Sequence, residues 1–224
     1  MYIRYYVFLK GEDMNFEIKV NLKNIVGEFL GLAKPGNVCD ADGNDKSDLV
    51  CFDDYVKVCK KENEHTFEDM AKVAALLLEM QNKQIVPDEY VELSKGFSEI
   101  VKANKKLDIS ESRDYVFFAY ECMREIEKLE NKVYCSVSDE NSGVYAVASQ
   151  EDDISCVVVV NNNPDFIFAD VEIDGLPGRA VSIDYYYADE QNQLSVACNT
   201  DTKLEKTKIV IPMTPYSLHL FKIR

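Results

Sequence analysis

The sequence contains no tryptophan, only two histidines and no pair of cysteines in a Cys-x-x-Cys arrangement. Zinc ribbons need close pairs of Cys or His ligands, so a structural zinc site has no support. Catalysis by a nucleophile that needs an imidazole base would depend on His65 or His219. Neither a Walker loop nor a G-x-G-x-x-G pattern occurs, and a nucleotide site is therefore not indicated.

Positive charge is scarce. Twenty-five Lys and Arg residues stand against forty Asp and Glu residues, which gives a formal net charge of −15. Affinity for DNA and RNA comes largely from basic side chains that neutralise phosphates. We therefore expect no nucleic-acid partner and no anionic membrane partner. Solubility alone is a sufficient reason for such acidity.

The seven cysteines do not form the even-numbered, closely spaced set of a disulfide framework. Several lie among apolar residues and are expected to be buried as small hydrophobic side chains. This use of cysteine is typical of a reducing compartment, and it predicts a cytoplasmic protein. The apolar run at residues 2–9 is too short to span a membrane, and it lacks the features of a signal peptide.

The first 131 residues predict a mainly helical region with a starting hairpin. Residues 2–9 and 15–20 have the composition and alternation of two strands joined by a turn at Gly11. Apolar residues then recur at helical spacing over 22–33. Thr66, with Asp69 three residues later, predicts a capped helix. Further helices are expected from Pro87 and over 112–130, the latter capped by Ser110 or Ser112.

At Asn131 the apolar period changes from about 3.6 to 2, the spacing of strands. Short apolar runs separated by turn residues follow, at 132–137, 144–149, 154–160, 166–173, 180–187, 193–198, 207–211 and 216–223. About eight short strands at this spacing predict an antiparallel β-sandwich. The predicted fold class is therefore α+β, with a helical domain at 1–131 and a β-sandwich domain at 132–224.

Several of these segments resemble a known family. Residues 115–120 and 127–133 are similar to the last helix of a glycoside-hydrolase barrel where it enters a C-terminal β-sandwich. Residues 144–149 and 154–163 resemble paired strands of that sandwich in β-xylosidases and α-arabinofuranosidases, and 211–220 resemble its closing strand. The resemblance covers about residues 110–224.

The catalysts of that family carry two glutamates on an eight-stranded barrel. Only about 110 residues precede the matching helix here, whereas a barrel typically needs about 250. Asn63-Glu64 is the one Asn-Glu pair before the β region, and it lies in a charged stretch. The resemblance therefore implies an accessory module or a degenerate relative, and we assign no catalytic residue.

An Asp-rich loop offers a candidate metal site. Asp40, Asp42 and Asn44 match oxygen positions 1, 3 and 5 of a calcium loop, and Asp48 falls at position 9. Position 6 lacks the usual glycine and position 12 lacks the usual acid, which argues against tight binding. A solvated turn is the alternative interpretation, because Asp, Asn and Gly are common turn residues.

Tyrosines are the candidate binding residues. Tyr145, Tyr185 and Tyr187 could present amphipathic rings to a sugar in the absence of tryptophan. Ordinary strand packing is the alternative, since tyrosine favours strands. His219 alternates with leucines on the last predicted strand and is expected at the surface or half-buried.

The leading hypothesis for function is a non-catalytic module that binds carbohydrate or supports a partner protein, with no cofactor other than calcium. A reduced or atypical glycoside hydrolase is one alternative, and a protein-interaction domain is another. Two carboxyls facing each other about 5–10 Å apart in a cleft favour hydrolysis. Exposed tyrosine rings without such a pair favour binding.

Overall fold

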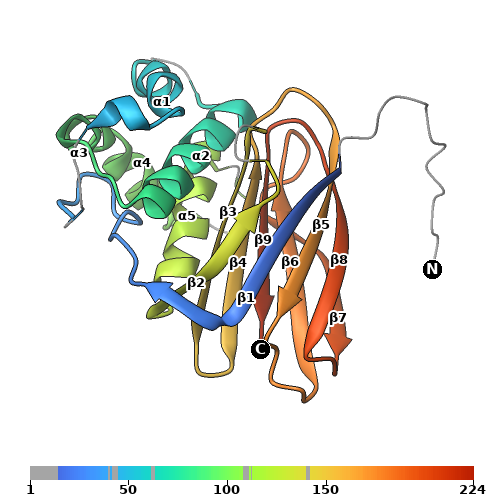
Figure 1. The fold of residues 1–224 in the computed structure, drawn as a ribbon. Coiled ribbons are helices and arrows are strands. Elements are labelled where there is room, and N and C mark those ends of the chain that lie inside the picture. Colours follow the sequence, from blue (N-terminus) through green and yellow to red (C-terminus); the bar gives the residue numbers. More distant parts are fainter. Residues whose placement is uncertain are drawn as a thin grey trace.

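The computed structural model describes residues 15–39, 41, 45–61, 64–107, 111, 113–139 and 142–224, with 195–197 described by their backbone alone. In chain order the elements are β1 (Asn15–Gly27), η1 (Lys46–Asp48), α1 (Phe52–Cys59), α2 (Phe67–Lys83), α3 (Asp88–Ser94), α4 (Phe97–Asn104), α5 (Tyr115–Glu127), β2 (Asn131–Val137), β3 (Val144–Glu151), β4 (Ile154–Asn161), β5 (Ile167–Asp174), β6 (Val181–Ala188), β7 (Ser195–Thr202), β8 (Lys206–Met213) and β9 (Ser217–Ile223). The helices gather on one side of the sheet (Figure 1).

The strands form one mixed sheet in the order β7-β6-β9-β4-β3-β2-β1-β5-β8. β1 runs parallel to β5 and antiparallel to β2. The sheet curls into a nearly closed, barrel-like shape (Figure 1). Alternate residues of its strands point inward and form an apolar interior cluster, which includes Val20, Val159, Val171 and Ile183.

The predicted fold class is therefore wrong. The N-terminal strand β1 belongs to the same sheet as the later strands, with β2 on one side and β5 on the other. Alternation predicts a strand with one buried face, but it does not distinguish two packed sheets from one curled sheet, because both enclose a single interior. Residues 2–9 lie outside the described residues, and the division into two domains at residue 131 stays a prediction.

The helix predicted for residues 22–33 does not form. β1 continues to Gly27, and Leu22 extends the inward row of Ile18 and Val20. Near this point the Lys23 N–H donates to Asn21 Oδ1 at 3.1 Å, and the pairing with β2 becomes irregular. A bend in a strand can place apolar residues at helix-like spacing, so periodicity alone was misleading here.

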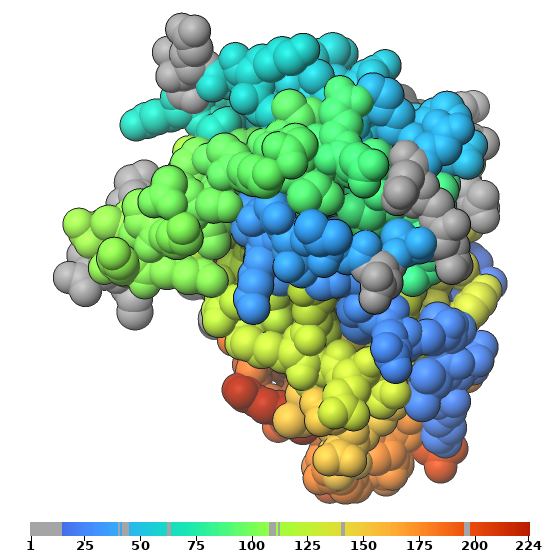
Figure 2. Space-filling model, turned by 90° about the vertical axis from the view of Figure 1, so that its left-hand side faces the viewer, coloured from blue at the N-terminus to red at the C-terminus, as the bar shows by residue number. Residues whose placement is uncertain are grey.

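The segment after β1 is held by two polar side chains, of which Gln81 is buried and Glu127 is half-buried. Gln81 of α2 accepts from the Leu30 N–H at 3.0 Å and donates to its carbonyl at 2.8 Å. Glu127 of α5 accepts from the N–H groups of Leu32 and Ala33 at 2.7 and 3.0 Å. Figure 2 shows this segment in blue, between the green helices and the yellow-green residues of α5 and the following strands.

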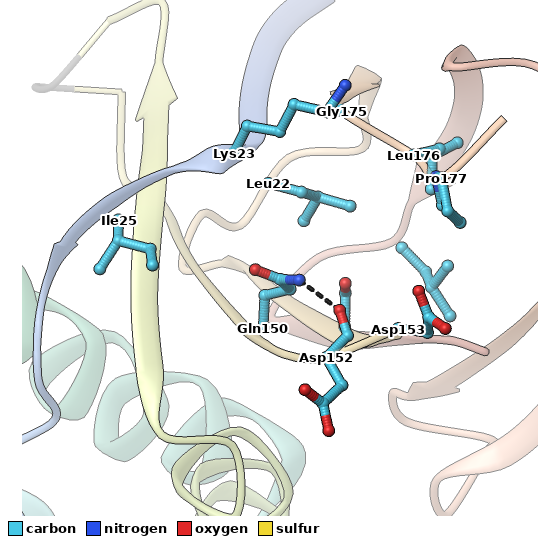
Figure 3. Close-up of a pocket in the computed structure, with 11 residues that line it drawn as sticks. Leu22, Lys23, Ile25, Gln150, Asp152, Asp153, Gly175, Leu176 and Pro177 are labelled. Atoms are coloured by element: carbon cyan, nitrogen blue, oxygen red, sulfur yellow. Dashed lines mark hydrogen bonds between the residues drawn. The ribbon is translucent and has the colours of Figure 1, made fainter.

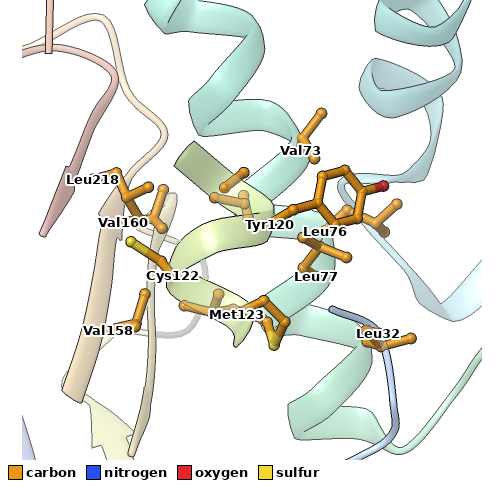
Figure 4. Packing of buried hydrophobic residues seen from close by; sticks show 14 of the residues in the cluster. Leu32, Val73, Leu76, Leu77, Tyr120, Cys122, Met123, Val158, Val160 and Leu218 are labelled. Atoms are coloured by element: carbon orange, nitrogen blue, oxygen red, sulfur yellow. The ribbon is translucent and has the colours of Figure 1, made fainter. Parts of the chain in front are cut away.

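Helices α2 and α5 pack on the outer face of β3, β4 and β9. The helix-side cluster joins Cys122 and Met123 of α5 to Val158, Val160 and Leu218 of the sheet (Figure 4). The capping box predicted at Thr66 and Asp69 is confirmed, and it satisfies backbone N–H groups at the start of α2. In the described part of the chain, no helix is long and apolar enough to cross a bilayer.

The helix expected from Pro87 is broken into α3 and α4 near Gly96. α5 begins later than expected, with Asp114 as its N-cap accepting from the Val116 N–H at 2.9 Å. Ser110 and Ser112, the predicted caps, lie outside the described residues. The eight strands expected after Asn131 all form, within a few residues of their predicted bounds.

Candidate functional site

A cleft of about 710 Å³ lies where the helices meet the sheet. Residues of α1 and α2 and the loop before α1 line one side, and residues of β2 and β3 line the other. Val26, Gly143, Asn162 and Asn163 complete the lining. The cleft therefore depends on how the helical layer packs against the sheet.

Glu79 of α2 is buried at the helical side of this cleft. Its two carboxylate oxygens accept from the N–H groups of Val50 and Cys51, each at 2.9 Å. Lys83, one turn later, donates to it at 2.9 Å. These bonds hold the loop before α1 against α2, and both carboxylate oxygens are therefore already hydrogen-bonded within the protein.

Tyr145 of β3 brings an aromatic ring to the cleft. The Cys51 thiol donates to the Tyr145 phenolic oxygen at 3.1 Å. Burial raises the pKa of that thiol to about 12, so it remains a protonated donor near neutral pH. Because the phenolic oxygen accepts this bond, the phenolic proton can be donated to a further group.

An amide acceptor lies in the same cleft. The Oδ1 atom of Asn162 is buried, and it has no hydrogen-bond partner among the described residues. Buried polar atoms are nearly always bonded, so an unbonded acceptor on a residue that lines a cleft is a candidate partner for a ligand that donates a hydrogen bond and reaches it. By contrast, the neighbouring Asn163 amide donates to the Ser142 carbonyl at 2.7 Å.

The carboxylates of Glu79 and Asp54 both line this cleft, and each is bonded to another group of the protein. Glu79 is bonded as described, and Asp54 forms an ion pair with Lys57 at 2.6 Å. The candidate Glu64 is exposed and does not line the cleft, and Asn63 lies outside the described residues.

His219 is buried inside the sheet, which corrects the expectation of a surface or half-buried residue. The Ser217 hydroxyl donates to the Thr214 carbonyl at 2.7 Å, so its oxygen accepts from His219 Nε2 at 2.8 Å. Nδ1 then accepts from the Tyr185 hydroxyl at 2.7 Å. In a catalytic Ser-His pair the serine donates to the imidazole, so this arrangement runs in the opposite direction.

His65 has a structural environment as well. Its Nδ1 lies 2.9 Å from the Asp114 carboxylate at the N-cap of α5, and its ring packs edge-on against Phe97. The hydrogen bond to Asp114 raises the pKa of His65. The residue joins the starts of α2 and α5, and it lies outside the cleft lining.

A second, smaller pocket of about 310 Å³ lies between the β3–β4 turn and the segment after β5 (Figure 3). Leu22 and Leu176 give it an apolar floor, and Gln150 donates to the carbonyl of Asp152. Asp153 is paired with Arg179. None of its described lining residues is aromatic, so it offers no ring for a sugar to stack on.

The structure separates the three predicted binding tyrosines. Tyr145 lines the cleft, whereas Tyr185 and Tyr187 stack on each other on β6 with ring centroids 6.0 Å apart. Tyr185 also stacks on Phe221 at 4.9 Å, against the interior cluster. A binding role for Tyr185 and Tyr187 stays a prediction.

The calcium prediction falls mostly outside the described residues. Asp40, Asp42 and Asn44 are not described, while Asp48 is exposed at the end of η1. The described residues contain no cluster of three or more His, Cys, Asp or Glu side chains suited to a metal ion. Calcium binding by this loop remains a prediction.

Two cleft residues were missed from the sequence. Glu79 interrupts the run Leu76-Leu77-Leu78-Glu79-Met80, and a charge inside an apolar helical run is a usable sign of a buried contact. Lys132 alternates with apolar residues on β2, a pattern that normally indicates a solvated face. The side chain instead reaches the Gln81 carbonyl of α2, a contact that no local pattern shows.

Comparison with known proteins shows which solved structures share the fold of this chain. No protein-family model and no curated protein sequence matches the chain. Solved structures do match. The match with the GH39 enzyme from Xanthomonas axonopodis pv. citri has 9% identity and a TM-score of 0.51, and it covers 92% of this chain and 54% of the enzyme chain. The match with a monomeric β-xylosidase from Caulobacter crescentus has 11% identity and a TM-score of 0.52, and it covers 74% of this chain and 43% of the xylosidase chain.

A glucosidase from Croceicoccus marinus matches at 11% identity and a TM-score of 0.51, and the match covers 70% of this chain and 41% of the glucosidase chain. The chain thus has a glycoside-hydrolase-like fold, and it spans about half or less of the length of these enzymes. The narrower expectation of their C-terminal β-sandwich is not established by these matches.

Proposed function

We propose that this chain is a non-catalytic module of glycoside-hydrolase-like fold that binds carbohydrate in the cleft between α2 and β3. The observation that carries the proposal is the buried, unbonded Asn162 acceptor in the same cleft as the Tyr145 ring. Sugars present apolar C–H faces together with hydroxyl groups. Their recognition therefore needs a flat ring beside a few well-placed polar atoms.

Glu79 accepts from the loop before α1, and Asp54 is paired with Lys57, which supports sugar binding over sugar hydrolysis. The matching enzymes are a xylosidase and a glucosidase by description, so xylo- and cello-oligosaccharides are the natural first ligands. The alternative is that the chain supports a partner protein and binds no sugar. A failure to bind either oligosaccharide would favour this alternative.

Isothermal titration with xylohexaose and cellohexaose tests the proposal. We expect saturable binding that Tyr145→Ala weakens by about tenfold or more, because a stacking ring is lost. Asn162→Ala should weaken binding by up to about tenfold without loss of stability, since it removes an acceptor that has no internal partner. Phe166→Ala, an exposed aromatic away from the cleft, is the matched control.

Absence of binding to both sugars would contradict the proposal, and so would equal binding by wild type and Tyr145→Ala. A panel of aryl-glycosides should show no turnover above buffer. Turnover that Glu64→Gln or Glu79→Gln abolishes, with the fold intact by circular dichroism, would instead establish the reduced glycoside hydrolase.

A further inference from the structure

Lys132 lies in the cleft in an unusual position for a lysine. Only 8% of the residue is exposed, and it lies on the outer face of β2 beneath the end of α2. Its ammonium donates to the Gln81 carbonyl in the last turns of that helix. No ion pair joins it to a carboxylate of the described residues. Lysines are rarely buried without such a partner.

Its neighbours in the sheet leave space and provide no charge. Gly27 pairs with Lys132 from β1, and a Cβ placed on Gly27 would meet no atom within 4 Å. Ser149 pairs with it from β3, and the Ser149 hydroxyl has no hydrogen-bond partner among the described residues. Lys132 thus has no charged cross-strand neighbour, and it lines a cleft that a small molecule can enter.

Burial lowers the pKa of Lys132 to about 8. The Cys135 thiol, on the same strand, acts in the opposite direction only when ionised, and burial raises the pKa of that thiol to about 12. At pH 7 about a tenth of this amine is therefore uncharged, against about one part in 3,000 for an ordinary lysine. Lysines desolvated in this way are the ones that act as nucleophiles toward carbonyl groups.

We propose that Lys132 is a carbonyl-reactive amine, which captures a small aldehyde that enters the cleft as a reversible imine. The uncharged amine adds to the aldehyde carbon, and the C–N bond forms as the C=O π pair moves to oxygen. Proton transfer gives a carbinolamine. Loss of its hydroxyl as water then leaves the C=N bond, with no oxidant or reductant required. This site is independent of carbohydrate binding, since only the amine and access to the cleft are needed.

Reductive trapping tests the proposal. The protein is incubated with glycolaldehyde and sodium cyanoborohydride at pH 7, and the labelled lysines are identified by peptide mass mapping. We expect Lys132 to be labelled at least about tenfold faster than exposed lysines such as Lys19, because more of its amine is uncharged. The labelling rate of Lys132 relative to that of Lys19 should fall as the pH rises, with a midpoint near pH 8, because the pH dependence of the reduction step is shared by both lysines.

Lys132→Arg should remove the fast-labelled site, whereas Lys83→Arg should retain it, since Lys83 lines the same cleft but is paired with Glu79. The wild-type pH profile does not depend on how the variants fold. Labelling of Lys132 no faster than that of Lys19, or a midpoint near pH 10, would overturn the proposal. Binding of oligosaccharides is measured separately, so either proposal can fail alone.

Discussion

Three buried or half-buried polar side chains bond to the backbone of a segment distant in the sequence. Glu79, Gln81 and Glu127 accept N–H groups from loops that precede helices or follow β1. Burial raises the pKa of Glu127 to about 7, although the N–H groups it accepts act in the opposite direction. Such contacts are specified by tertiary packing, and for this reason the sequence indicated none of them except through the isolated charge of Glu79.

Replacement of Glu79 by Ala should destabilise the protein by roughly 2 kcal/mol, because the buried Cys51 N–H and the part-buried Val50 N–H lose their acceptor. Glu89→Ala is the control, since Glu89 forms only an exposed pair with Lys46 and its loss should cost less than about 0.5 kcal/mol. Urea unfolding of both variants measures the difference. Equal effects would show that Glu79 has no special role.

His219 should make the protein sensitive to acid. Burial lowers the pKa of His219 to about 3, so the folded state keeps the ring neutral while the unfolded state protonates it below about pH 6.5. The unfolded state then binds one more proton, and stability falls with decreasing pH. Between pH 6 and pH 4 the advantage of wild type over His219→Gln should shrink by about 1.4 kcal/mol per pH unit.

His65 is the matched control, because folding raises its pKa, whereas folding lowers the pKa of His219. Its pKa is raised in the folded state by Asp114, so its contribution is fully present below the unfolded pKa and is lost as the pH rises through the folded pKa. His65→Gln should therefore cost more stability at pH 5 than at pH 8. Unfolding free energies over pH 4–8 check both variants, and parallel curves for wild type and His219→Gln would refute the assignment.

At the scale of elements, the sequence predicted most helices and strands and failed where a segment's partners lie far away. Alternation located β2 to β9, and the Thr66 and Asp69 cap located α2. The segment 22–33 was predicted wrongly, because its burial comes from the sheet and from Gln81 and Glu127. In the cleft, Tyr145 was predicted as a binding residue, but the contacts that surround it were not.

The junction between α5 and β2 provides a test of how strongly the elements are coupled. Leu129 is buried in the helix-side cluster together with residues of β3 and β4. Leu129→Asp should lower the stability of helices and sheet together, in one transition, because an unpaired buried charge costs several kcal/mol. Glu130→Ala, at an exposed neighbour, is the control.

Far-ultraviolet circular dichroism detects the helices, and the amide I infrared band detects the sheet. Two separated transitions, with only the helical signal shifted by Leu129→Asp, would contradict the coupling. They would also support two domains divided near residue 131.

At the scale of the whole molecule, a net charge of −15 acts against the compact state through self-repulsion. The ion pairs at the surface are mostly exposed and contribute little individually. Salt should therefore stabilise the protein: we expect Tm to rise as NaCl increases from about 10 to about 150 mM, where the screening length falls from about 30 to about 8 Å. Thermal scans measure this, and a falling Tm would show that ion pairs outweigh repulsion.

The position of β1 in the middle of the sheet has a consequence for how the chain folds. The backbone of Glu17 bonds to Ser138, which lies 121 residues further along, and the Asn15 amide reaches Asp170. Pairings of such long range must close large loops before they gain stability, so folding should be slow. During synthesis, both edges of β1 remain unpaired until β2 and β5 have left the ribosome. Throughout that interval an apolar strand is exposed, and the nascent chain is open to aggregation or to capture by a chaperone.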